Sequence, residues 1–109
     1  IIYPLYVPTG TSLKKEEKVS KTDGERIILT FGGNKSFTLV EEVAVVNDEL
    51  TVVPTYGEPY MLLDTVASLS SNSLNWVSNG IEYYIVSDVM NQNELIKVAE
   101  SLITVSSLK

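Results

Sequence analysis

The sequence contains no cysteine and no histidine among its 109 residues. The lack of cysteine excludes disulfides, thiolate nucleophiles and zinc–thiolate sites. The lack of histidine leaves any serine without an imidazole to act as its general base. Neither absence distinguishes the cytoplasm from the bacterial exterior, but together they exclude several common classes of enzyme.

Long hydrophobic runs and basic residues are also scarce. No stretch approaches the roughly 18 consecutive apolar residues of a membrane-spanning helix. Eight Lys and Arg residues against 14 Asp and Glu residues give a formal charge of −6. Because an acidic surface repels phosphate groups, we expect neither nucleic acids nor anionic lipid headgroups as direct partners.

The size and the start of the chain suggest one domain of a larger protein. A length of 109 residues with 44% hydrophobic content is ordinary for a single globular domain, here residues 1–109. The chain begins at Ile1 rather than Met. We therefore expect that a signal peptide, a lipid-attachment segment or a membrane anchor was removed, or that the domain belongs to a longer precursor.

The clearest local signal is a hairpin centred on Asn79-Gly80. This dipeptide favours a type I′ turn, because such a turn requires a positive φ at both central positions. A two-residue loop then pairs Trp76 with Tyr83 on one face. The same face receives Leu74 and Ile85, whereas the other face carries a mixed, half-exposed set: Asn75, Val77, Glu82 and Tyr84.

A capped amphipathic helix follows the hairpin. Asn91 offers an N-cap side chain, and Glu94 lies three residues further on, which is the spacing of a capping box. Apolar residues then recur at helical spacing: Leu95, Val98, Ala99 and Leu102. We expect this face to pack on the sheet and the helix to fray from about Thr104.

The first two thirds of the chain read as strands and turns. Pro4 and Pro8 exclude a helix at the start, and the charges of residues 13–20 are typical of an edge strand. A loop over residues 33–35 sets Phe31 opposite Phe37. The remaining strands are expected at residues 26–31, 36–46, 50–53 and 60–63, with a turn at residues 47–49.

Two places interrupt this pattern. In the third strand the main face carries Phe37, Leu39, Val43 and Val45, and Glu41 falls on the same face, which indicates a bulge or a strand end near Glu41-Glu42. Residues 64–72 are the least defined segment. Asp64 could cap a single helical turn there, whereas the serine cluster favours a loop.

The order of the elements predicts the fold class. Strands come first and one helix comes last, so the class is α+β with a mainly antiparallel sheet. We expect a curved β-meander of about six strands, with the C-terminal helix packed on its concave face.

No catalytic or metal-binding pattern emerges from the residue spacings. The segment Gly32-Gly33-Asn34-Lys35 lacks the spacing of a phosphate loop, and serines 68–73 lack a Gly-x-Ser-x-Gly context. The acidic residues lack the spacing of a calcium loop; they are Glu41, Glu42, Asp48, Glu49 and Asp64. We therefore expect no enzyme activity, no metal site and no cofactor.

Several segments resemble a bacterial family of uncharacterised domains. They are the extended Tyr-Pro start, Leu74-Asn-Trp, the Asn79-Gly80 turn and the helix Glu94-Leu-Ile-Lys-Val-Ala-Glu-Ser-Leu. Members of that family lie at the end of extracytoplasmic lipoproteins and of anti-sigma-factor-like membrane proteins in Gram-positive spore formers. The resemblance implies an extracytoplasmic location at the cell surface, anchored through the missing N-terminal region. It supplies no catalytic residues.

Two functional hypotheses remain. The first is a non-catalytic extracytoplasmic binding or sensor domain whose partner is another protein or a cell-envelope component. Tyrosine is common at binding surfaces, so its candidate residues are Tyr3, Tyr6, Tyr56 and Tyr60. The second is a small carrier of lipid or acyl chains of the half-barrel type, with an apolar cavity between helix and sheet. Its lining would be Trp76, Tyr83, Leu95, Val98 and Leu102.

Overall fold

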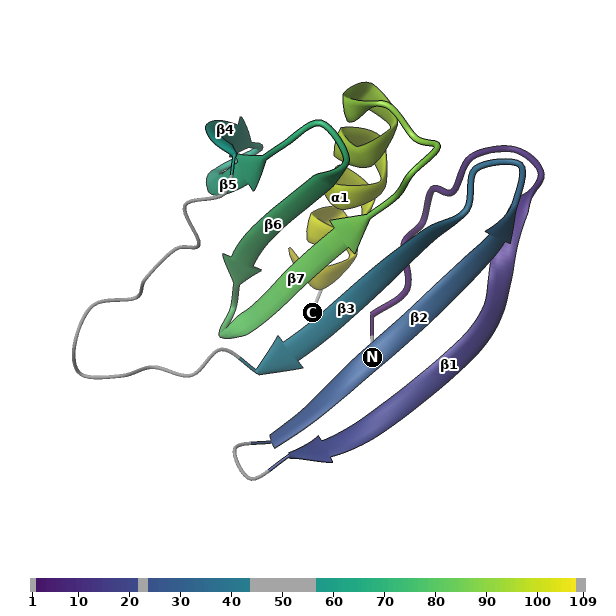
Figure 1. Ribbon diagram of the computed structural model, residues 1–109. Coiled ribbons are helices and arrows are strands. Elements are labelled where there is room, and N and C mark those ends of the chain that lie inside the picture. The colour runs from purple at the N-terminus through teal and green to yellow at the C-terminus, as the bar shows by residue number, and fades with distance from the viewer. Residues whose placement is uncertain (1, 22–23, 44–56, 108–109) are drawn as a thin grey trace.

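The computed structural model describes residues 2–21, 24–43 and 57–107. Within these ranges, seven strands form one antiparallel sheet and a single helix lies on one face of it (Figure 1). The elements are β1 (Thr11–Lys21), β2 (Gly24–Gly33), β3 (Phe37–Val43), β4 (Glu58–Leu62), β5 (Thr65–Leu69), β6 (Ser73–Ser78), β7 (Ile81–Val86) and α1 (Gln92–Ser107).

The predicted α+β class, the antiparallel sheet and the C-terminal helix are confirmed. The prediction of a single meander of about six strands is wrong in its order and slightly low in its count. The strands run β1-β2-β3-β7-β6-β5-β4 across the sheet, so two meanders are joined where β3 pairs with β7. This long-range pairing places the C-terminal hairpin at the centre of the sheet and leaves β1 and β4 at its edges.

The central hairpin has the predicted turn and register. Asn79 and Gly80 have φ values of 53° and 78°, as a type I′ turn requires. Trp76 lies opposite Tyr83, and the two rings stack with centroids 5.1 Å apart. Turn chemistry and side-chain alternation therefore agree on one arrangement of β6 and β7.

The helix begins with the predicted capping box. The Glu94 backbone N–H donates to Asn91 Oδ1 at 2.9 Å, and the Asn91 N–H donates to Glu94 Oε1 at 3.0 Å. This backbone hydrogen bond from Asn91 lowers the pKa of Glu94. The expected fraying at Thr104 is not found, because the helix continues to Ser107. The Thr104 hydroxyl donates to the Glu100 carbonyl one turn earlier.

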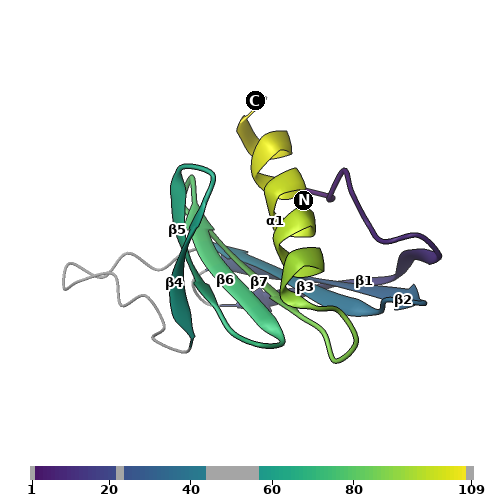
Figure 2. The same cartoon turned by 90° about the horizontal axis from the view of Figure 1, so that it is seen from above.

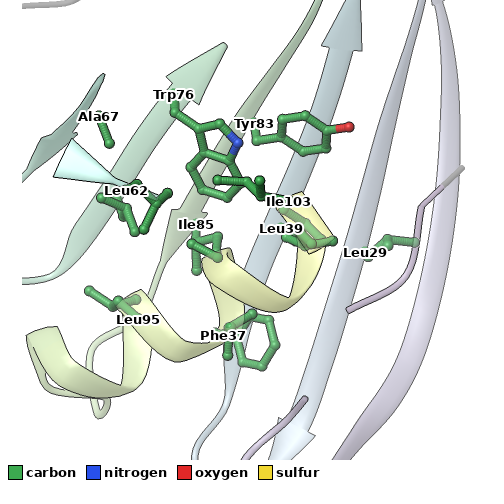
Figure 3. Close-up of a cluster of buried hydrophobic side chains, with 14 of the residues drawn as sticks. Leu29, Phe37, Leu39, Leu62, Ala67, Trp76, Tyr83, Ile85, Leu95 and Ile103 are labelled. Carbon is green, nitrogen blue, oxygen red and sulfur yellow. The ribbon is translucent and has the colours of Figure 1, made fainter. Parts of the chain in front are cut away.

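The core lies between the helix and the concave face of the sheet. Figure 2 shows β4 and β5 rising on the same side as α1, so the sheet curves around the helix. Figure 3 shows side chains from the strands and from the helix meeting in this layer. The buried apolar residues include Leu29, Phe37, Leu39, Leu62, Leu74, Trp76, Tyr83, Ile85, Leu95, Val98 and Leu102. Phe31 of β2 lies opposite Phe37 of β3, as predicted, and the two rings stack.

The two uncertain segments differ only in part from the predictions, because β3 ends at Val43, next to the strand end expected near Glu41-Glu42. The register of β3 with β2 and β7 is regular through Glu41, so there is no bulge at that residue. Glu41 is instead buried on the apolar face, whereas Val43 is exposed. Residues 65–69 are neither a helical turn nor a loop but strand β5, which pairs with β4 and β6. The strand and the turn predicted between residues 47 and 53, and Val45, lie outside the described residues.

The edge strand β1 agrees with its prediction. It carries charges of both signs, and its register with β2 shifts between Leu13 and Lys15. Charges and a bulge both protect an edge against pairing with another chain. Strand β4 forms the other edge, with Pro59 near its start.

Candidate functional site

The two faces of the sheet differ in how they are covered. The N-terminal segment before β1 lies on the same side as α1 (Figure 2). The opposite face, here called the open face, carries the residues that alternate with the core residues. Strand pairing places Ile28, Val40, Tyr84, Asn75 and Ser68 next to one another in a row across five strands.

The open face holds a groove of about 440 Å³. The described side chains that line it come from five strands, and they combine one aromatic ring, two aliphatic residues and several polar groups. They are Arg26 and Ile28 of β2, Val40 and Glu42 of β3, Ser68 of β5, Ser73 and Asn75 of β6, and Glu82 and Tyr84 of β7. The groove therefore depends on the non-local β3–β7 pairing.

Two polar pairs hold the walls of the groove. Arg26 Nε and Nη2 donate to the two carboxylate oxygens of Glu42 at 3.3 and 3.5 Å. Asn75 Nδ2 donates to Glu82 Oε2 at 3.2 Å and to the Tyr83 carbonyl at 2.9 Å. Because the two side chains of each pair restrict one another's rotamers, these polar groups are held in fixed positions.

Asn75 and Tyr84 are the two most informative residues of the groove. Asn75 is only 8% exposed, and both hydrogens of its amide nitrogen are used. No described residue donates to its Oδ1 atom. Tyr84 is 39% exposed, and its hydroxyl makes no hydrogen bond to a described residue. The groove thus offers an accessible aromatic ring beside a fixed acceptor.

The described residues of this site offer hydrogen-bonding groups and an aromatic ring. Among the described residues, no group of three or more His, Cys, Asp or Glu residues is placed to hold a metal ion. The two carboxylates of the groove, Glu42 and Glu82, accept hydrogen bonds from Arg26 and Asn75. Serines line the groove at positions 68 and 73, and the chain has no histidine to activate them.

The tyrosines predicted as a binding surface are not brought together. Tyr3 and Tyr6 lie in the N-terminal segment on the helix side, where Lys97 Nζ sits 5.7 Å from the centre of the Tyr6 ring. Tyr60 is on β4 at the far edge of the sheet and packs partly against the core. Tyr56 lies outside the described residues.

Tyr3 is tied to the edge strand. Its hydroxyl donates to Glu16 Oε1 of β1. This hydrogen bond raises the pKa of Tyr3, and desolvation and the negative charges of Glu16 and Glu41 raise it further. Tyr3 and Tyr6 therefore fasten the N-terminal segment to β1 and to α1.

The residues predicted to line a carrier cavity form solid core instead. Their exposed fractions are between 0 and 2%: Trp76, Tyr83, Leu95, Val98 and Leu102. A cavity that admits water would leave accessible surface on its lining. Burial, and then the negative charge of Glu41, raise the pKa of Tyr83 to about 12.

A second hollow of about 380 Å³ lies at the end of β3 on the helix side. Of the five predicted cavity residues only Tyr83 borders it, and its other described walls come from the N-terminal segment and from β1, β2, β3 and β7. Glu41 belongs to this wall, where its Oε1 accepts a hydrogen bond from the Ile2 N–H at 3.0 Å. No described residue of α1 lines this hollow.

Sequence reasoning missed the groove, although part of its signal was present. The alternation of the hairpin placed Asn75, Glu82 and Tyr84 together on a mixed face. Local patterns could not show that β3 and β2 continue this face with Val40 and Arg26. Within the described residues, α1 is the only helix, and it is too short and too polar to span a membrane.

The chain is similar to the sporulation protein YdcC of Bacillus subtilis (strain 168). The two are 40% identical over 99 residues, which is 91% of this chain and 29% of that protein. The chain thus spans less than a third of the length of the curated relative that it matches. No protein-family profile and no solved structure matches the chain.

Proposed function

We propose that the chain is a non-catalytic extracytoplasmic binding or sensor domain of a bacterial lipoprotein or membrane-tethered regulator. The groove on the open face is the observation that carries this proposal. The concave face is filled by the helix and the N-terminal segment, whereas the open face presents Tyr84 between two ordered polar pairs. A surface of this kind suits recognition of a partner or a ligand.

The similarity to a sporulation protein supports a domain that acts as part of a longer chain. The matched region covers nine tenths of this chain but 29% of the relative. A domain of this size, with one core and a groove of its own, suits a recognition module attached to other segments. The family resemblance supports an extracytoplasmic location, which is part of the proposed function.

The carrier alternative receives no support from the packing. A carrier needs an apolar cavity between helix and sheet, and there Leu95, Val98 and Leu102 are at most 1% exposed. These side chains fill the space that a lipid chain would occupy. The groove itself is lined by charged and polar groups, which suit a polar ligand better than an acyl chain.

A domain exchange in B. subtilis tests the proposed function. The matched segment of the sporulation protein YdcC is replaced by this chain or deleted, and heat-resistant spores are counted. We expect the exchange to retain spore formation and the deletion to reduce it at least about tenfold, at equal protein levels. Normal spore formation by the deletion strain would contradict the proposed function.

A second measurement tests the location. Alkaline phosphatase, which is active only outside the cytoplasm, is fused to the C-terminal end of the exchanged protein. We expect phosphatase activity in intact cells. An inactive but stable fusion would place the domain in the cytoplasm and contradict the proposal.

A further inference from the structure

We propose that the groove on the open face binds an oligosaccharide. This inference rests on the proposed binding function and names its ligand class. It follows from three features of the described residues of the groove: an exposed aromatic ring, fixed hydrogen-bonding groups around it, and a small excess of negative charge.

Tyr84 provides the stacking platform. Its side chain is 39% exposed in the middle of the row that runs from Ile28 to Ser68. The face of an aromatic ring carries negative partial charge and attracts positively polarised C–H groups. One face of a pyranose ring presents such C–H groups, so a sugar can stack on Tyr84 without losing the hydrogen bonds of its hydroxyls.

The polar neighbours of Tyr84 match the edges of a sugar. Each sugar hydroxyl both donates and accepts, and the groove offers both kinds of group within a short distance. Asn75 Oδ1 and the Glu82 carboxylate can accept, and the Arg26 guanidinium can donate. Because Arg26 is held by Glu42 and Asn75 by Glu82, little side-chain entropy is lost when the ligand binds.

Charge and size also favour a neutral glycan. Among the described residues that line the groove, the charged groups are Arg26, Glu42 and Glu82, which leave one excess negative charge within a chain of net charge −6. Phosphorylated or carboxylated polymers would be repelled. A volume of about 440 Å³ falls within the usual range of small-ligand sites.

A protein partner is the less favoured occupant of this groove. Protein interfaces deplete charged residues at their centres. Among the described residues of this groove, three charged side chains accompany a single aromatic ring. This arrangement suits a ligand that carries polar groups on its whole perimeter.

Calorimetric titration of the 109-residue chain tests the proposal with two probes, the tetramer of N-acetylglucosamine and cellotetraose. We expect saturable binding of at least one, with an affinity between micromolar and millimolar. Tyr84→Ala should weaken it at least about tenfold, and Tyr84→Phe by less than about threefold. Tyr6→Ala is the matched control, because Tyr6 is 37% exposed on the helix side, and it should leave the affinity unchanged.

Amide chemical shifts supply a readout that does not depend on any variant. During the titration we expect the largest changes at Val40, Asn75 and Tyr84 and none at Lys97. Arg26→Gln keeps a hydrogen-bond donor but removes the charge, and it should weaken binding about threefold or more. This variant serves as the test if Tyr84→Ala does not fold.

Three results would overturn the proposal: no binding of either probe at millimolar concentration, full binding by Tyr84→Ala, or shift changes confined to the helix side. These outcomes are separate from failure of the proposed function. If neither sugar binds but Tyr84→Ala still abolishes spore formation in the exchange strain, the groove recognises another partner and only the ligand class is wrong.

Discussion

The ring of Trp76 stacks on the ring of Tyr83 at the centre of the sheet, with an interplanar angle of 13°. The pair lies directly across β6 and β7, and each side chain is 2% exposed. Its position is set by the Asn79-Gly80 turn and by the register that this turn imposes. The same register turns Tyr84, the next residue, towards the groove on the opposite face.

Removal of the Trp76 side chain should strongly destabilise the protein. Trp76→Ala deletes a large buried ring, and we expect a loss of about 3–5 kcal/mol in the free energy of unfolding, measured by urea denaturation. Within the described residues, Trp76 Nε1 has no hydrogen-bond partner. Trp76→Phe should therefore cost less than half as much, because it removes an unpaired polar group. A loss below about 1 kcal/mol for Trp76→Ala would place the residue outside the core.

Two glycines should respond differently to alanine. Both have a positive φ, 128° for Gly33 and 78° for Gly80. A Cβ at Gly80 meets nothing within 4 Å, so only the left-handed backbone is strained, at a cost of about 1 kcal/mol. A Cβ at Gly33 would overlap the Gly10 carbonyl oxygen, and the loss should be roughly 3 kcal/mol or more. Equal losses in thermal unfolding would contradict this packing.

The capping box should contribute measurably to stability. Asn91→Ala removes the acceptor of the Glu94 N–H, and we expect a loss of about 0.5–2 kcal/mol in urea denaturation. Asn91→Ser keeps an acceptor at the same position and should lose less. If both substitutions have the same effect, Asn91 acts through something other than its side-chain oxygen.

Stability should fall with rising pH as Tyr83 ionises. Its pKa is raised from 10.0 to about 12, mainly by burial, so the folded state keeps a proton that the unfolded chain releases. The resulting stabilisation is complete below about pH 10 and is lost as the pH approaches about 12. Urea midpoints of the wild type and of Tyr83→Phe, measured over this range, isolate the effect. The midpoint of Tyr83→Phe should fall less steeply, and parallel curves would contradict the assignment.

Sequence reasoning was most accurate where local signals agreed. Asn79-Gly80 and the alternation around Trp76 predict the same register, and the spacing of Asn91 and Glu94 marks the helix start. In each case turn or cap chemistry, hydrophobic period and propensity lead to one structure. The stacked pair Phe31–Phe37 followed from the same reasoning.

The errors arose where non-local packing outweighed local preference. Residues 65–69 lie beside a serine cluster that favours a loop, but pairing with β4 and β6 makes them a strand. Glu41 follows the regular register and is buried on the helix side, where it accepts a hydrogen bond from the Ile2 N–H. The β3–β7 pairing, and with it the groove around Tyr84, joins residues that are 38 to 48 positions apart and leaves no local signature.

The most direct test of the central claim, that the open face is the functional surface, compares Tyr84→Ala with Tyr6→Ala in the B. subtilis exchange strain. The two tyrosines have similar exposure, 39% and 37%, but lie on opposite faces of the sheet. We expect Tyr84→Ala to reduce heat-resistant spores at least about tenfold and Tyr6→Ala to leave them unchanged, with equal amounts of folded protein. Equal spore counts for both variants, or a defect confined to Tyr6→Ala, would contradict the assignment of function to the groove.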